Sequence, residues 1–193
     1  HPCLAHPTIE DRYMSRKFSV AEYHQMIRAG ILDENDNVEL IRGDIVLKPP
    51  KTTRRCSCVD RMNDLFFRRL SRRAIISIHD PVRLHDSEPE PAVMLLRPKA
   101  DFYESGKPRP PDVLLLIEVS DTSIDYDRAV KGTLYAKANI GEFWILNLND
   151  DTLEVYRDPQ ADGTYRDVRI LRRGDQIEIA ALPGVVVQVD ELL

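Results

Sequence analysis

Hydrophobic and polar positions follow two different periods along this chain, and the two periods separate predicted helices from predicted strands. The segment SVAE at 19–22 is a capping box, and the apolar pattern after it stops at Gly30, which predicts a helix over 20–29. A further helix is indicated over 127–138. The segment 56–73 also predicts a helix, because its apolar residues recur at helical spacing, at Val59, Met62, Phe66 and Leu70.

Strand patterns lie between these helices. The stretch NVELIRGDIVLK alternates on both sides of Arg42-Gly43, which predicts two strands joined by a tight turn. The run DVLLLIEV at 112–119 is continuously apolar and typical of a strand buried on both faces. The mixed order of helices and strands predicts an α/β (α+β) fold. Shorter strands are predicted at 75–78, 92–96 and 143–148, a surface loop at 105–112, and later turns at Asp150-Asp151 and Asp162-Gly163.

The length of 193 residues predicts one domain over 1–193, with residues 1–15 as an N-terminal extension. No apolar run approaches the ~20 residues that span a bilayer, so we expect no membrane association and a cytoplasmic protein. The three cysteines, Cys3, Cys56 and Cys58, are an odd number and lack zinc-knuckle spacing. Reduced thiols in a cytoplasm are therefore expected.

Charge is distributed unevenly along the chain. The net charge of −5 argues against a generally adhesive nucleic-acid coat. The segment 51–73 nevertheless carries eight basic residues against Asp60 and Asp64: Lys51, Arg54, Arg55, Arg61, Arg68, Arg69, Arg72 and Arg73. Such a patch could track phosphate groups. A solvated outer helix face is the alternative, because three of the arginines, Arg61, Arg68 and Arg72, fall opposite the apolar stripe.

Three charged residues are candidates for chemistry. Glu118 lies inside LLLIEVS, where an ionised group is costly unless a cation or hydrogen-bond donors compensate it. The alternative is that it pairs with an arginine or is solvated at the strand end. Glu39 in VELIRGD by itself reads as an ordinary polar-face residue. Lys131 follows Asp127 by four residues, a spacing that by itself indicates an exposed helical ion pair.

Taken together, these segments carry a family resemblance. The chain resembles the Uma-type family of bacterial proteins, known as putative restriction endonucleases, which looks like a member of the PD-(D/E)XK nuclease superfamily. The resemblance rests on FSVAEY, VELIRGDIV, SEPEPAV, RPKADFY, LEVYRDP, LPGVVV and the long run DVLLLIEVSDTSIDYDRAVKGTLYAKANIGEFWILNL. It implies a restriction-endonuclease-like mixed β-sheet core flanked by helices, a Mg²⁺ or Mn²⁺ cofactor and DNA as the partner. A homodimer remains an open question.

The resemblance also implies roles for individual residues. Glu118 matches a main metal ligand and Glu39 the accessory carboxylate of the first hairpin. The superfamily often places a lysine where this chain has Ser120, and Lys131 on the following helix is the expected replacement, with Asp127 orienting it. The basic charge of segment 51–73, and not the resemblance, supplies the arginines expected to contact DNA: Arg54, Arg55, Arg61, Arg68 and Arg72.

Two positions depart from the family pattern. The family supplies a metal-binding aspartate where this chain has Ala92, and a histidine where our alignment places Arg55. Glu90 is the one obvious substitute ligand, since residues two apart in a strand share a face, but its flanking prolines make it a weak one. The sequence therefore predicts a Mg²⁺-dependent DNA endonuclease with a degenerate, weak or inactive site. The alternative is a non-catalytic DNA-binding or interaction protein that retains the nuclease fold.

Overall fold

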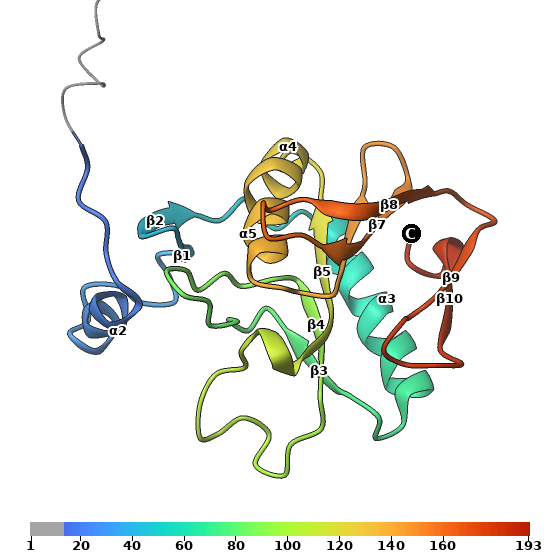
Figure 1. The fold of residues 1–193 in the computed structure, drawn as a ribbon, viewed down its shortest axis with the longest axis horizontal. Coiled ribbons are helices and arrows are strands. Elements are labelled where there is room, and N and C mark those ends of the chain that lie inside the picture. The colour runs from blue at the N-terminus through green and yellow to red at the C-terminus, as the bar shows by residue number, and fades with distance from the viewer. Residues whose placement is uncertain (1–13) are drawn as a thin grey trace, which may run out of the picture.

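A six-stranded mixed sheet forms the centre of the computed structural model, which describes residues 14–193 (Figure 1). The strand order is β3-β4-β5-β6-β7-β8. β5 and β6 are parallel, and the other neighbouring strands are antiparallel. The strands are β3 (Ile75–Ile78), β4 (Val93–Leu96), β5 (Val113–Ser120), β6 (Glu142–Asn147), β7 (Thr152–Pro159) and β8 (Tyr165–Leu171).

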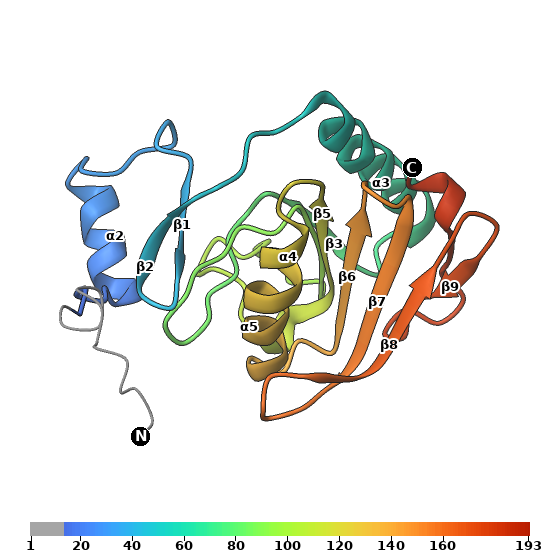
Figure 2. The ribbon, with the colours of Figure 1, turned by 90° about the horizontal axis from the view of Figure 1, so that it is seen from above.

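Helices cover the two faces of this sheet, as the view from above shows (Figure 2). Helix α3 (Thr53–Leu70) packs on one face. The other face carries α4 (Ile124–Tyr126), a π-helical turn (Asp127–Lys131) and α5 (Gly132–Lys137). Every residue of β5 is buried, which confirms the two-sided burial predicted from its apolar run. The predicted mixed α/β fold, with a sheet flanked by helices, is confirmed.

A helix and a hairpin lie beside this core at one end of the molecule (Figure 1). They are α2 (Val20–Arg28), β1 (Val38–Ile41) and β2 (Asp44–Leu47). The predicted turn is present, with Arg42 at φ 51° and Gly43 at φ 79°, the pair of positive angles that a type I′ hairpin requires. The backbone N–H of Glu88 donates to the Leu40 carbonyl at 2.7 Å. This bond ties the hairpin to the segment before β4 and brings β1 close to the sheet.

Helix ends differ from the sequence predictions. The capping box of Ser19 and Glu22 is present at the start of α2. Helix α3 begins three residues earlier than expected, because the Thr52 hydroxyl caps it by accepting from the Arg55 N–H, and it ends at Leu70. The helix predicted over 127–138 is already preceded by α4 and contains a π-helical turn. Periodicity alone locates a helix better than it locates helix ends.

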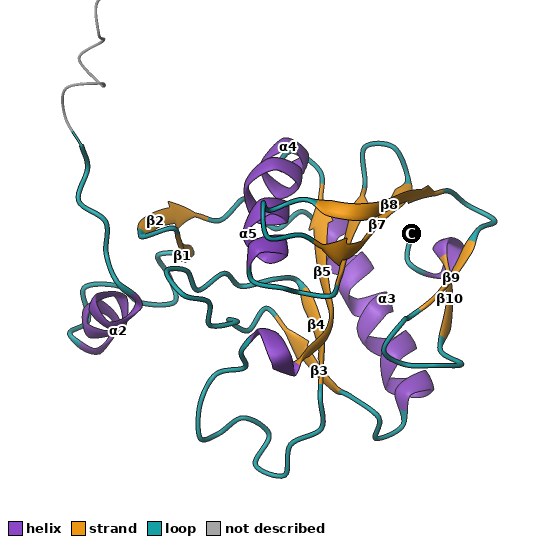
Figure 3. Cartoon of the chain, viewed as in Figure 1, coloured by secondary structure: helices purple, strands orange, loops and turns teal. Residues whose placement is uncertain are grey.

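The rest of the described chain is short elements and loops (Figure 3). The predicted loop 105–112 ends in the 3₁₀ turn η1 (Pro110–Asp112), and β9 (Gln176–Glu178), β10 (Val186–Gln188) and η3 (Val189–Glu191) follow β8. Cys56 and Cys58 are free thiols, whereas Cys3 and most of the predicted N-terminal extension lie outside the described residues. Within 14–193, no helix has the length and apolar character needed to cross a membrane.

Candidate active site

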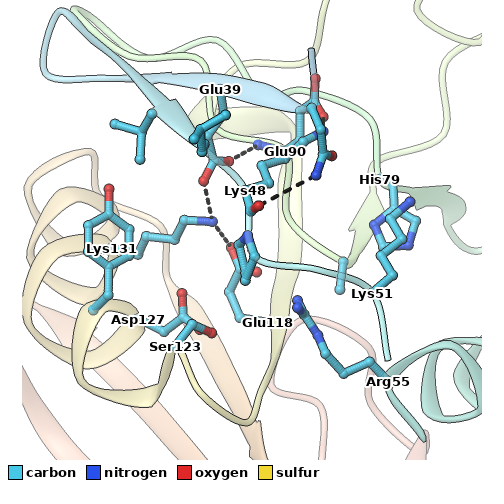
Figure 4. A pocket seen from close by; sticks show the side chains of 16 residues that line it. Glu39, Lys48, Lys51, Arg55, His79, Glu90, Glu118, Ser123, Asp127 and Lys131 are labelled. Carbon is cyan, nitrogen blue, oxygen red and sulfur yellow. Dashed lines mark hydrogen bonds and ion pairs between the residues drawn. The ribbon is translucent and has the colours of Figure 1, made fainter. Parts of the chain in front are cut away.

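The hairpin, the helix after β5 and the start of α3 enclose a cavity of about 240 Å³ (Figure 4). Its wall brings together seven of the residues singled out from the sequence, namely Glu39, Arg55, Glu90, Ala92, Glu118, Asp127 and Lys131. These residues come from five separate parts of the chain, and several are deeply buried. The convergence of the two glutamates and the lysine expected from the sequence is therefore present.

Lys131 is the centre of the cavity's hydrogen bonding. Its ammonium nitrogen lies 2.9 Å from Oε1 of Glu39 and 3.1 Å from Oε1 of Glu118. The Tyr135 hydroxyl donates to the same Glu118 oxygen at 2.8 Å. All of these side chains are buried, so Lys131 is not the exposed ion-pair partner that its spacing from Asp127 by itself indicates. The π-helical turn presents Lys131 inward, toward strands β1 and β5.

Burial and mutual charge shift the pKa values of this group. Burial raises the pKa of Glu118 to about 7, although the positive charge of Lys131 opposes that shift. Burial alone would lower the pKa of Lys131, but the charges of Glu118 and Glu39 outweigh it and hold that pKa above its usual value. Lys131 therefore stays protonated and acts as the fixed cation between the two carboxylates.

Asp127 is held by two serine hydroxyls. Ser123 donates to Oδ2 of Asp127 at 2.7 Å, and Ser120, at the end of β5, donates to the same oxygen. Ser120 does not itself line the cavity. Ser120 therefore holds Asp127, which belongs to the same π-helical turn as Lys131.

Position 92 faces the cavity but carries only a methyl group. Ala92 is buried just before β4 and lines the cavity near Glu39 and Glu118. Glu90, the predicted substitute ligand, also lines it, but its carboxylate accepts a hydrogen bond from Lys48. Its backbone N–H donates to Oε2 of Glu39 at 2.9 Å. Glu90 thus orients Glu39 through its backbone, while its carboxylate is paired with a lysine.

Four further titratable residues of the cavity were not singled out as site residues from the sequence: Lys48, Lys51, Tyr126 and His79. His79 follows directly after β3, and residues just beyond a strand end often reach the site at that edge of a sheet. That signal was present in IISIHDP. Lys51 appeared only as one charge in the basic segment, because nothing local showed that it lies in the wall of the cavity.

The arginines expected to contact DNA are spread over α3, and one of the five lines the cavity, Arg55. Arg54 donates to the Leu148 carbonyl at 2.7 Å and pairs with Asp151. Arg68 pairs with Asp64 at 2.8 Å on an exposed helix face. Two others, Arg61 and Arg72, likewise lie away from the cavity. Much of the basic charge of α3 is therefore engaged in contacts within the protein.

The donor set limits what the cavity can hold. Among residues 14–193, no group of three or more His, Cys, Asp or Glu side chains is arranged to bind a metal ion. Glu39 and Glu118 offer the hard oxygen ligands that Mg²⁺ prefers. Lys131 donates to both of them, however, and Ala92 contributes no ligand atom.

The sheet and helices define a nuclease-like fold, as a solved structure shows. The crystal structure of a putative nuclease belonging to DUF820 from Anabaena variabilis ATCC 29413 superposes with a TM-score of 0.67 and 14% identity. The alignment covers 86% of this chain and 94% of that one. The sequence profile of the Uma2 family, described as "Putative restriction endonuclease", matches residues 20–190, so this chain belongs to that family. No curated protein matches the chain.

Proposed function

We propose that this protein is a DNA-binding member of the Uma2 family whose Mg²⁺-dependent phosphodiester hydrolysis is very weak or absent. Family membership and the nuclease-like fold support DNA as the substrate class. The cavity with Glu39, Glu118 and Lys131 supports the location of the site. The main support for weak hydrolysis is Ala92. This residue lines the cavity at the position where the family resemblance implies an aspartate.

The residues present do not fit a tightly held divalent cation. In the superfamily such a cation polarises the phosphodiester and activates water, which supplies several kcal/mol of transition-state stabilisation. Here the Lys131 ammonium group lies between Glu39 and Glu118 and pairs with both. Two serine hydroxyls donate hydrogen bonds to Oδ2 of Asp127. Each 1.36 kcal/mol of lost stabilisation is a factor of ten in rate, so a partial loss costs on the order of a hundredfold or more. Hydrolysis at this site is therefore expected to be very slow.

Restoring the missing carboxylate tests this proposal. Ala92→Asp adds an anionic oxygen ligand beside Glu118, so we expect it to bind Mn²⁺ at least about tenfold more tightly than the wild type. Isothermal titration calorimetry measures this affinity without depending on activity. Ala92→Asn is the matched control, because it adds a side chain of similar size with a neutral oxygen, and we expect a much smaller gain.

Cleavage of supercoiled plasmid is measured second, in the same metal concentrations. Nicking by Ala92→Asp above the wild-type rate supports a nuclease that lost its metal ligand. A revertant that binds Mn²⁺ tightly without nicking points to the second departure, at Arg55. Equal Mn²⁺ affinity for the wild type and Ala92→Asp refutes the idea that position 92 is a ligand position.

A further inference from the structure

His79 lies directly beside the position from which the carboxylate is missing. Ile78 pairs with Val93 in the antiparallel β3–β4 ladder, and the backbone N–H of His79 donates to the Ala92 carbonyl at 3.2 Å. Both residues also line the cavity, so His79 and Ala92 are neighbours in its wall.

Two cations lie on the same side of the cavity as His79. Lys51 and Arg55 line it, and neither has a carboxylate within ion-pair distance among residues 14–193. The Arg55 guanidinium donates to the Pro50 carbonyl at 3.1 Å, which leaves most of its five N–H groups for another acceptor. Figure 4 shows Arg55 and His79 approaching from the side opposite Lys131 and Asp127.

Helix α3 adds to this positive wall. Arg55 belongs to its first turn, which contains no acidic residue, although acidic residues are the ones that stabilise a helix N-terminus. The helix is 18 residues long, so its N-terminal N–H groups carry the positive end of a full helix dipole. An anion bound beside Arg55 would interact favourably with both charges.

The positive charges nearby also affect the protonation of His79. Burial and then the positive charges of Lys51, Lys48 and Arg55 lower its pKa to about 4, although Asp80 opposes them. At neutral pH its imidazole is therefore uncharged and has one N–H to donate. His79 also adopts a left-handed backbone conformation at φ 57°, and backbone strain of this kind is often found at functional sites.

We propose that Lys51, Arg55 and His79 form a subsite that binds one phosphate group of the DNA backbone without a metal ion. The inference rests on the proposed DNA-binding function and names how the cavity would hold its ligand. Guanidinium, ammonium and imidazole N–H groups are suited to the non-bridging oxygens of a phosphodiester. With alanine at position 92, that position contributes no carboxylate to repel the anion, and Asp80 is the acidic neighbour of His79.

The test is DNA binding in excess EDTA, measured by fluorescence anisotropy with a short duplex at low salt. We expect the wild type to bind, and Arg55→Gln and Lys51→Gln each to weaken binding about tenfold and to lower the slope of log affinity against log salt by about 1. Arg172→Gln is the matched control, because Arg172 is exposed, lies away from the cavity and has no carboxylate within ion-pair distance in the described chain. We expect it to bind like the wild type.

A second measurement keeps the subsite testable if duplex binding is not detected. Inorganic phosphate is titrated into ¹⁵N-labelled protein, and the His79 signal is assigned by its loss in His79→Asn. A bound anion favours the imidazolium, so the pKa of His79 should rise on phosphate addition.

Three results would each overturn the subsite: variant affinities equal to that of the wild type, DNA binding that requires a divalent ion, or a His79 pKa that phosphate does not change. If the wild type binds DNA in EDTA and Arg55→Gln binds equally well, the subsite is refuted and the proposed DNA binding stands. If the wild type does not bind DNA but the pKa of His79 responds to phosphate, the proposed DNA-binding function is refuted and the subsite stands.

Discussion

The buried carboxyl of Glu118 should make the stability of the protein depend on pH in a way that one substitution removes. Burial raises the pKa of Glu118 from 4.5 to about 7. Between these two values the folded protein binds a proton at Glu118 more strongly than the unfolded chain does. The free energy of unfolding therefore falls as pH rises through this range. The contribution is fully present below pH 4.5 and lost above about pH 7.

The size of the effect follows from the distance between the two pKa values. One pKa unit corresponds to 1.36 kcal/mol, so the change from 4.5 to about 7 corresponds to roughly 3 kcal/mol. Solvent screening does not reduce it much, because Glu118 is 4% exposed. Since Glu118→Gln cannot titrate, the stability of this variant relative to the wild type should rise by about 3 kcal/mol between pH 4.5 and pH 8.

Urea denaturation followed by circular dichroism at pH 4.5, 6 and 8 measures this difference. Glu34→Gln is the control, because Glu34 is exposed in the loop before β1, and its stability relative to the wild type should be the same at every pH. A constant difference between Glu118→Gln and the wild type across the range would show that Glu118 keeps an ordinary pKa. The account of Lys131 as a fixed cation beside a partly neutral carboxyl would then be wrong.

Two further predictions concern the stability contributed by buried side chains. Ser120→Ala removes one of the two hydroxyls that donate to Asp127, so we expect a loss of about 1–3 kcal/mol of unfolding free energy, and a loss under 0.3 kcal/mol would mean that Ser123 suffices alone. Phe66→Ala empties a fully buried position between α3 and the sheet and should cost about 3–5 kcal/mol by urea denaturation, whereas the exposed Phe67→Ala should change stability by less than about 0.5 kcal/mol.

Local signals in the sequence predicted local structure well. The capping box at Ser19 and the turn at Arg42-Gly43 depend on residues within a few positions of one another, and both are present. The apolar run of β5 predicted burial on both faces for the same reason. The family resemblance supplied the expectation that Glu39 and Glu118 meet, which no local pattern contains.

The other wall of the cavity could not be predicted in this way. His79 stands beside Ala92 because of the register between β3 and β4, and register is set by pairing across the intervening loop. Lys131 points inward from the end of a π-helical turn, which the helical periodicity of 127–138 did not predict. Strand register and helix irregularity depend on contacts between distant parts of the chain. For this reason local sequence patterns predicted neither the place of His79 in the cavity nor the burial of Lys131.

The two departures from the family pattern change the charge of the cavity in one direction. If the family resemblance holds at both positions, alanine in place of an aspartate removes a negative charge from the cavity, and Arg55 in place of a histidine adds a permanent positive charge at the start of α3. Either change alone would weaken the binding of a cation. Together they also favour an anion, because the cation between Glu39 and Glu118 is already supplied by Lys131. Ala92 and Arg55 together therefore fit the proposed phosphate subsite better than they fit a divalent-cation site.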